Sequence, residues 1–72
     1  MYYGRNKQPL DGQLCLCRCP GWCDEGYQVA VFEDGEFHYS GESNNWLNEY
    51  VIAWMPIDRE GELISNYLEI IK

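Results

Sequence analysis

All four cysteines of this 72-residue chain lie in one short segment, CLCRCPGWC, which runs from Cys15 to Cys23. A chain of this length buries only about 60% of the surface that its unfolded form exposes. Domains this small often need a disulfide or a metal ion for stability. The segment can hold a metal, form two disulfides, or pack as buried apolar thiols.

Zinc is the ligand that we expect the cysteine segment to hold. A structural zinc ion takes four ligands in a tetrahedron, but Cys15 and Cys19 would lie about 13 Å apart at Cα in an extended strand. The chain must therefore bend, and Pro20 and Gly21 supply a bend directly after Cys19. The expected ligands are Cys17, Cys19 and Cys23, with either Cys15 or His38 as the fourth. Disulfides are less favoured because no secretory signal precedes the segment and intracellular thiols stay reduced; unliganded packing stays open.

The pattern of the first forty residues predicts an antiparallel sheet. Residues 13–19 alternate between leucines on one face and cysteines on the other, which is typical of a strand. Residues 27–32 predict a second strand, and the Asp34-Gly35 turn that follows predicts a two-residue hairpin. In that hairpin Phe32 should face Phe37, and Val31 should face His38.

The second half of the chain predicts one more strand and a helix. Residues 41–49 indicate a loop, and residues 50–55 indicate a short buried strand closed by Pro56. Beyond Asp58, a candidate N-cap, apolar residues recur at helical spacing: Leu63, Ile64, Tyr67, Leu68 and Ile71. The expected fold is a single α+β domain over residues 1–72. It has a small antiparallel sheet of three to four strands, a C-terminal helix and a zinc staple.

The charge balance indicates a basic protein surface as the partner. The chain carries 12 acidic and 5 basic residues, a net charge of −7. This disfavours direct nucleic-acid binding and binding to anionic membranes, which both depend on Lys and Arg. The acidic candidates flank two turns, and two tryptophans could anchor an interface: Asp24, Glu25, Glu33, Asp34, Glu36, Trp22 and Trp46. The alternative is that the charge serves solubility and the tryptophans complete a small core.

No catalytic residue is predicted, and we expect no enzyme activity. The sequence has no Ser-His-Asp arrangement, phosphate-binding glycine loop or H-E-x-x-H helix. It also has no apolar stretch of the ~20 residues that a membrane span needs. We expect a cytoplasmic protein that is a monomer or a weak dimer.

Residues 9–57 resemble a family of small phage and prophage proteins of unknown function. The resemblance rests on Pro9, Asp11-Gly12, the stretch YQVAVFEDGEF, Trp46 and the stretch AWMPI. Members of that family run from a Pro-x-x-Gly opening, through Y-x-V and hairpin motifs, to a closing W-M-P-L. The cysteine segment and the residues after Asp58 depart from this pattern.

The resemblance implies a phage origin and a role in evading host defence. Small acidic phage proteins without catalytic motifs are similar to anti-CRISPR proteins, which bind the basic nucleic-acid channels of RNA-guided nucleases. The implied function is inhibition of a CRISPR effector nuclease, with the type II class favoured, by blocking target-DNA loading in the host cytoplasm. The alternative is a phage regulatory or adaptor protein that binds a different host or phage protein.

Overall fold

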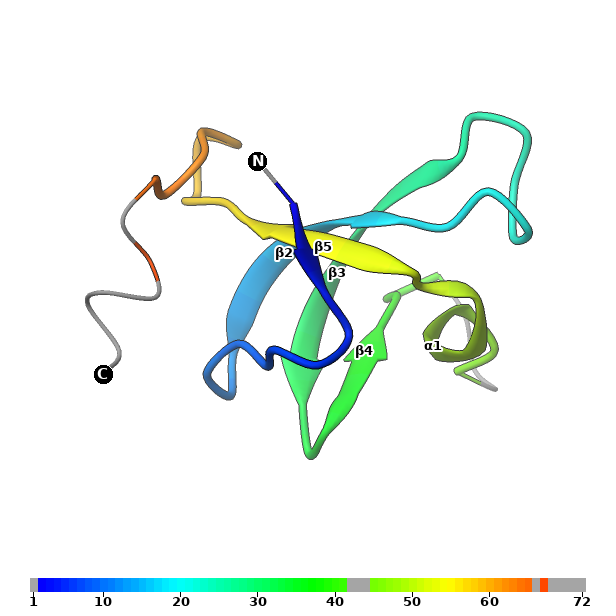
Figure 1. The fold of residues 1–72 in the computed structure, drawn as a ribbon, viewed down its shortest axis with the longest axis horizontal. Coiled ribbons are helices and arrows are strands. Elements are labelled where there is room, and N and C mark those ends of the chain that lie inside the picture. Colours follow the sequence, from blue (N-terminus) through cyan, green and yellow to red (C-terminus); the bar gives the residue numbers. More distant parts are fainter. Residues whose placement is uncertain (1, 42–44, 66, 68–72) are drawn as a thin grey trace.

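Five strands and one short helix make up the part of the chain that the computed structural model describes, residues 2–41, 45–65 and 67. The strands form one antiparallel sheet in the order β1-β5-β2-β3-β4 (Figure 1). The elements are β1 (Tyr3–Gly4), β2 (Gln13–Arg18), β3 (Tyr27–Glu33), β4 (Glu36–His38), α1 (Leu47–Tyr50) and β5 (Ala53–Pro56). The predicted small antiparallel sheet is confirmed, although it has more strands than the three or four expected.

The predicted hairpin is confirmed in both its turn and its register. Asp34 and Gly35 have φ angles of 53° and 80°. Positive φ at both central residues is the geometry that suits a two-residue hairpin, and Asp-Gly favours it. Phe32 pairs with Phe37, and Val31 pairs with His38.

The segment predicted as one strand over residues 50–55 is instead divided between two elements. Tyr50 ends α1, and β5 begins at Ala53 and includes Pro56. A helix of four residues is too short to produce a periodic signal in the sequence. Pro56 fits inside the strand because β1 pairs only with Ala53 and Trp54, so no β1 residue needs a hydrogen bond from position 56.

The predicted C-terminal helix does not begin at Asp58. The Asp58 carboxylate Oδ1 instead accepts hydrogen bonds from the backbone N–H groups of Glu60 and Glu62, both at 2.9 Å, and so closes a turn. Leu63 then pairs with Ile57 in an isolated β-bridge. The predicted role of Asp58 as a helix N-cap is wrong, because its carboxylate accepts its hydrogen bonds within a local turn rather than from the first turn of a helix. The predicted helical residues Leu68 and Ile71 lie outside the described residues.

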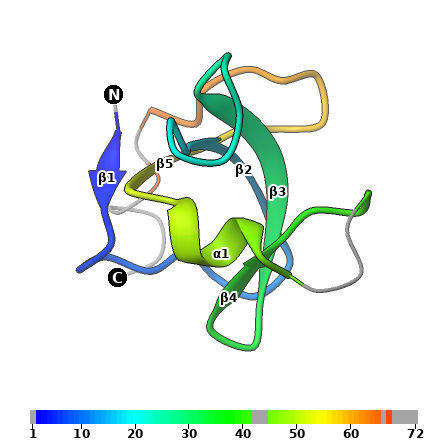
Figure 2. The same cartoon turned by 90° about the vertical axis from the view of Figure 1, so that its right-hand side faces the viewer.

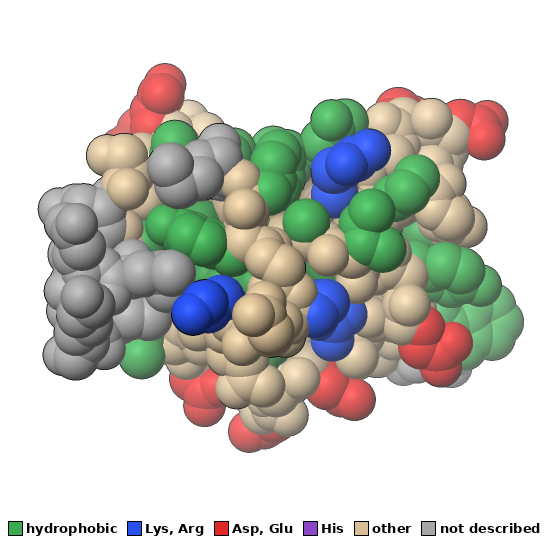
Figure 3. Space-filling view, viewed as in Figure 1, with side chains coloured by type: hydrophobic (Ala, Val, Ile, Leu, Met, Phe, Trp, Pro, Cys, Tyr) green, Lys and Arg blue, Asp and Glu red, His purple; other side chains and the backbone are tan. Residues whose placement is uncertain are grey.

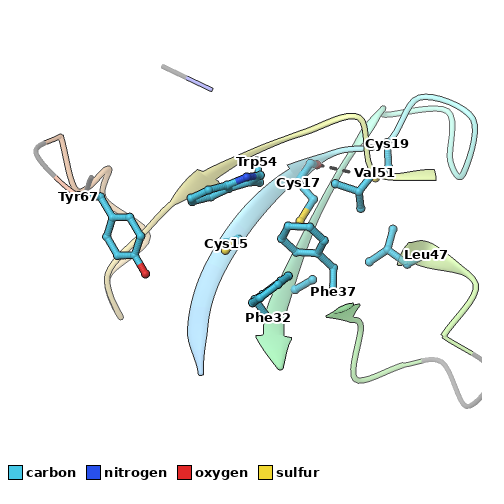
Figure 4. Close-up of a cluster of buried hydrophobic side chains, with 10 residues drawn as sticks. Cys15, Cys17, Cys19, Phe32, Phe37, Leu47, Val51, Trp54 and Tyr67 are labelled. Atoms are coloured by element: carbon cyan, nitrogen blue, oxygen red, sulfur yellow. Dashed lines mark hydrogen bonds between the residues drawn. The ribbon is translucent and has the colours of Figure 1, made fainter. Parts of the chain in front are cut away.

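The core lies on the cysteine face of β2, and the leucine face is half-exposed. Figure 4 shows the buried cluster, in which Cys15 and Cys17 lie between Trp54 and two phenylalanines and Cys19 lies beside Val51. The cluster comprises Cys15, Cys17, Cys19, Ala30, Phe32, Phe37, Leu47, Val51, Trp54 and Tyr67. The sheet curves around this core, so that β1 and β3 lie on opposite sides of it with α1 between them in the view of Figure 2.

Arg5 closes the core between β1 and α1. Its Nη1 donates to the carbonyl oxygens of Asn48 and Val51, both at 2.9 Å, and its guanidinium lies 5.2 Å from the centroid of the Phe37 ring. The carbonyl groups at a helix C-terminus lack partners within the helix, and a guanidinium satisfies two of them here. Trp54 holds the same segment, because its Nε1 donates to the carbonyl oxygens of Gly4 and Lys7.

Candidate partner-binding site and cysteine cluster

Four carboxylates lie at the hairpin end of the sheet, and we call them the acidic end: Asp11, Glu33, Asp34 and Glu36. Glu33 and Glu36 are paired across the hairpin, and Asp34 is in its turn. Asp11 joins them because its Oδ1 accepts a hydrogen bond from the Asp34 backbone N–H at 3.3 Å. All four side chains are exposed. Like charges directly opposite one another destabilise a sheet, so the Glu33–Glu36 pair does not stabilise the hairpin.

Sequence reasoning missed Asp11 as a member of the acidic end. Asp11 precedes β2 by two residues and looks like an ordinary turn residue beside Gly12. Its contact with Asp34 arises because β2 and β3 are paired as far as Gln13 and Phe32, which brings the residues before β2 to the hairpin turn. A register of this kind cannot be read from a single sequence.

Trp46 lies beside the acidic end and is 61% exposed. The preceding residue, Asn45, donates from Nδ2 to the Glu36 carboxylate at 3.0 Å. Asn48 anchors the same helical turn to β4, because its Oδ1 accepts a hydrogen bond from the Phe37 backbone N–H at 2.9 Å. Two side-chain contacts to β4, from Asn45 and Asn48, therefore flank the residue that carries this exposed indole.

The predicted acidic residues do not form one surface. Asp24 and Glu25 precede β3, whereas the acidic end lies at the other end of that strand, and its seven residues separate the two groups by about 20 Å. In Figure 3, Asp and Glu side chains accordingly appear around the rim of the molecule, with Lys and Arg nearer its middle. Trp22 is half-buried and packs edge-on against Tyr39, with the ring centroids 5.1 Å apart. Of the two tryptophans predicted as anchors, Trp46 is the more available.

The four cysteines are distributed along β2 and its following turn. Cys15, Cys17 and Cys19 have no exposed surface, and Cys23 is partly buried. The side chains of Cys19 and Cys23 interact, and the Cys19 thiol also donates to the Cys17 carbonyl oxygen at 3.7 Å. His38 is exposed, and its Nε2 contacts the Glu33 carbonyl oxygen at 3.2 Å. It pairs with Val31, one residue from the inward-facing Phe32, and so lies on the sheet face opposite the cysteines.

The structure therefore brings together two of the five predicted zinc ligands. The described residues include all four cysteines and His38, and they contain no group of three or more His, Cys, Asp or Glu side chains arranged to hold a metal ion. This donor set does not fit a tetrahedral zinc site as it is arranged here. Zinc binding stays a prediction.

Burial keeps the core thiols protonated. It raises the pKa of Cys15 to about 12 and that of Cys19 to about 11, and it raises the pKa of Cys17 still further. A neighbouring cysteine adds a smaller increase for Cys17 and Cys19. Because the thiolate is the form that binds metals and attacks electrophiles, either reaction at these cysteines requires loss of a thiol proton that burial favours keeping.

No family model, curated protein or solved structure matches this chain.

The described residues form no pocket. Among the same residues, no helix is both long enough and apolar enough to cross a membrane. The candidate site is the exposed acidic end together with Trp46.

Proposed function

We propose that this chain is an inhibitory binding protein that places its acidic end in a basic groove of a protein partner. The observation that carries the proposal is the set of four carboxylates at the hairpin turn, three on the hairpin and Asp11 bonded to it, which is tied through Asn45 to the turn that carries Trp46. Charges of one sign on a convex tip accelerate association with a groove of the opposite sign. A tryptophan at the centre of an interface is a common source of binding energy.

The partner class that we propose is an RNA-guided nuclease of the CRISPR type, with type II favoured. This part rests on the resemblance of residues 9–57 to small phage proteins, together with the net charge of −7. The nucleic-acid channel of such a nuclease is positively charged because it holds a phosphate backbone. Carboxylates of the acidic end would occupy positions of phosphate groups and prevent loading of target DNA.

Cleavage and DNA-binding assays with a guide-loaded type II effector test this proposal. One variant removes three charges from the acidic end (Glu33→Gln, Asp34→Asn, Glu36→Gln), and asparagine at position 34 tolerates the positive φ there. The matched control removes three charges elsewhere (Glu49→Gln, Glu60→Gln, Glu62→Gln), all at exposed positions. We expect inhibition to weaken by about tenfold or more in the first variant, because truncated interfacial charges cost about 2–5 kcal/mol. The control should stay within about threefold.

Two results would contradict the proposal. Equal losses in the two variants would show that net charge, rather than the acidic end, drives binding. Stoichiometric protein that leaves both DNA binding and cleavage unchanged across several effectors would rule out the inhibitor. The alternative function, a regulatory or adaptor protein that binds a different host or phage protein, would then be favoured.

A structural zinc ion is a separate part of the proposed fold. Cys19 and Cys23 would supply two ligands, and the rest of the set requires Cys17 and either Cys15 or His38 to move towards them. Native mass spectrometry before and after acid tests this directly. One zinc mass that acid removes would support the metal, and a metal-free mass with four alkylatable thiols would leave the cysteines as core residues. A mass lower by four hydrogen atoms would indicate disulfides.

A further inference from the structure

The first half of β3 has an open edge. β4 has three residues and pairs with Val31, Phe32 and Glu33, whereas β3 begins four residues earlier at Tyr27. Among the described residues, no strand pairs with Tyr27–Ala30 on the β4 side. After β4 the chain turns away from β3, as Figure 1 shows.

The hydrogen-bonding groups of Tyr27 and Val29 point out of this edge. In an antiparallel pair, successive residues direct their N–H and C=O groups to opposite sides of the strand. The Gly26 and Phe32 carbonyl oxygens accept bonds from the β2 side, from Cys19 and Gly12, both at 2.7 Å. The even-numbered residues of β3 therefore face β2, and the odd-numbered ones face away from it.

These outward groups have weak partners. The Tyr27 carbonyl oxygen accepts from the Cys23 thiol at 3.6 Å, and the Val29 carbonyl oxygen accepts from the Gln28 amide at 3.3 Å. In the described part of the chain, the Val29 N–H has no hydrogen-bond acceptor. Backbone donors from an added strand could replace both side-chain bonds at shorter distance.

The edge lacks the features that usually prevent strand addition. Natural edges carry lysine, proline or a bulge, but the sequence of residues 27–30 is YQVA and its pairing with β2 is one-to-one. Tyr27 and Val29 are 46% and 41% exposed and lie on the same face of the sheet. Leu16, opposite Val29, extends this apolar face.

We infer that the open edge of β3, Tyr27–Ala30, binds an extended basic peptide segment of a partner protein as an additional strand. Strand addition supplies backbone hydrogen bonds, and the exposed side chains of Tyr27 and Val29 supply apolar contacts. Asp24 and Glu25 stand directly before this edge and favour lysine or arginine in the added segment. A second copy of this chain is disfavoured, because it would bring a second Asp24-Glu25 pair and a further net charge of −7 to the same place. This edge is distinct from the acidic end, so its test is independent of the proposed function.

The test uses a fluorescent, capped seven-residue peptide of alternating lysine and valine as the probe. A second peptide has the same sequence but is N-methylated at alternate residues, so that it keeps its charge and side chains and loses the donors facing β3. We expect the first peptide to bind and the second to bind about tenfold more weakly or worse. Hydrogen exchange of the Val29 amide should also slow when the first peptide is added.

Two variants of Val29 locate the binding. Val29→Pro removes the outward N–H, and proline is tolerated where that group faces solvent at an edge. Val29→Thr keeps the N–H and a β-branched side chain. Affinity should fall about tenfold in the proline variant and stay within about twofold in the threonine variant.

Several outcomes would overturn the inference. Equal binding of the two peptides would show that charge attraction alone holds the probe. Equal binding of a glutamate–valine peptide would exclude a basic occupant, and no binding at millimolar probe would exclude strand addition. A dimer in light scattering that Val29→Pro dissociates would assign the edge to a second copy. If Val29→Pro fails to fold, the N-methylated peptide still decides the question.

Discussion

At the scale of single residues, Arg5 has more structural consequences than its position near the start of the chain suggests. The sequence around it, YYGRNK, has no clear period, and it predicts neither a strand nor a contact with distant residues. Yet Arg5 contacts two carbonyl oxygens and one aromatic ring that come from residues 37–51. Contacts at such sequence separation depend on the whole fold and are not encoded locally.

Replacing Arg5 should destabilise the protein. Arg5→Ala leaves the carbonyl oxygens of Asn48 and Val51 without their donor and removes the cation from Phe37, so we expect a loss of about 1–3 kcal/mol in the free energy of unfolding. Arg59→Ala, in the exposed turn after Asp58, is the matched control and should change it by less than about 0.5 kcal/mol. Urea denaturation measures both. Equal stabilities of the two variants would show that Arg5 does not hold β1 against α1.

The buried thiols predict a loss of stability in alkaline solution. A thiol in the unfolded chain ionises near its ordinary pKa of 9.0, whereas burial raises the pKa of Cys15 to about 12 and that of Cys17 further. Between these values the unfolded state releases protons that the folded state retains. The contribution of these thiols to the free energy of unfolding should therefore be constant well below pH 9 and decrease as the pH rises towards 12. Each such thiol contributes up to about 1.4 kcal/mol per pH unit.

Urea denaturation at several pH values between 7 and 11 measures this decrease. Cys15→Ala should give a shallower decrease than the parent chain, because one of the thiols that titrates between the two states is gone. A zinc-thiolate site would reverse the dependence, with stability lost as the pH falls. That result would mean that the cysteines are metal ligands rather than neutral core residues.

At the scale of elements, the strands with strong local signals were predicted and the short elements were not. Alternation identified residues 13–19, and Asp34-Gly35 fixed the hairpin and its register. β1 has two residues and α1 has four, which is too few for either period to appear. The helical spacing after Asp58 fails at Leu63, which pairs with Ile57 in a β-bridge.

The hairpin turn should be sensitive to substitution at Gly35 and tolerant at Asp34. Gly35 has a φ of 80° with no other atom within 4 Å of an added Cβ, so Gly35→Ala introduces backbone strain without a clash. We expect Gly35→Ala to lower the free energy of unfolding by about 1–2 kcal/mol. Asp34→Asn should leave it nearly unchanged, because asparagine adopts positive φ readily. Thermal unfolding of both variants checks this, and equal midpoints would contradict the turn geometry.

At the scale of the whole molecule, the acidic residues predicted around two turns lie at opposite ends of β3. Sequence reasoning identified Glu33, Asp34 and Glu36 at the hairpin turn. In the structure Asp11 also lies at this turn, whereas Asp24 and Glu25 lie before the other end of β3. Membership of such a surface depends on strand register and length, so residue type alone cannot define it. The same reasoning applies to the cysteines, which are close in sequence but lie along β2 and its following turn, where Cys19 and Cys23 are in contact.

Competition with target DNA is the measurement that most directly tests the central claim, that the acidic end occupies the phosphate-binding groove of a nuclease. The affinity of the guide-loaded effector for this protein would be measured at increasing concentrations of target duplex. If carboxylates take the place of phosphates, the apparent Kd for the protein should rise in proportion to DNA concentration once the DNA is in excess of its own Kd. An apparent Kd that does not change with DNA, or an effector that does not bind the protein, would contradict the account.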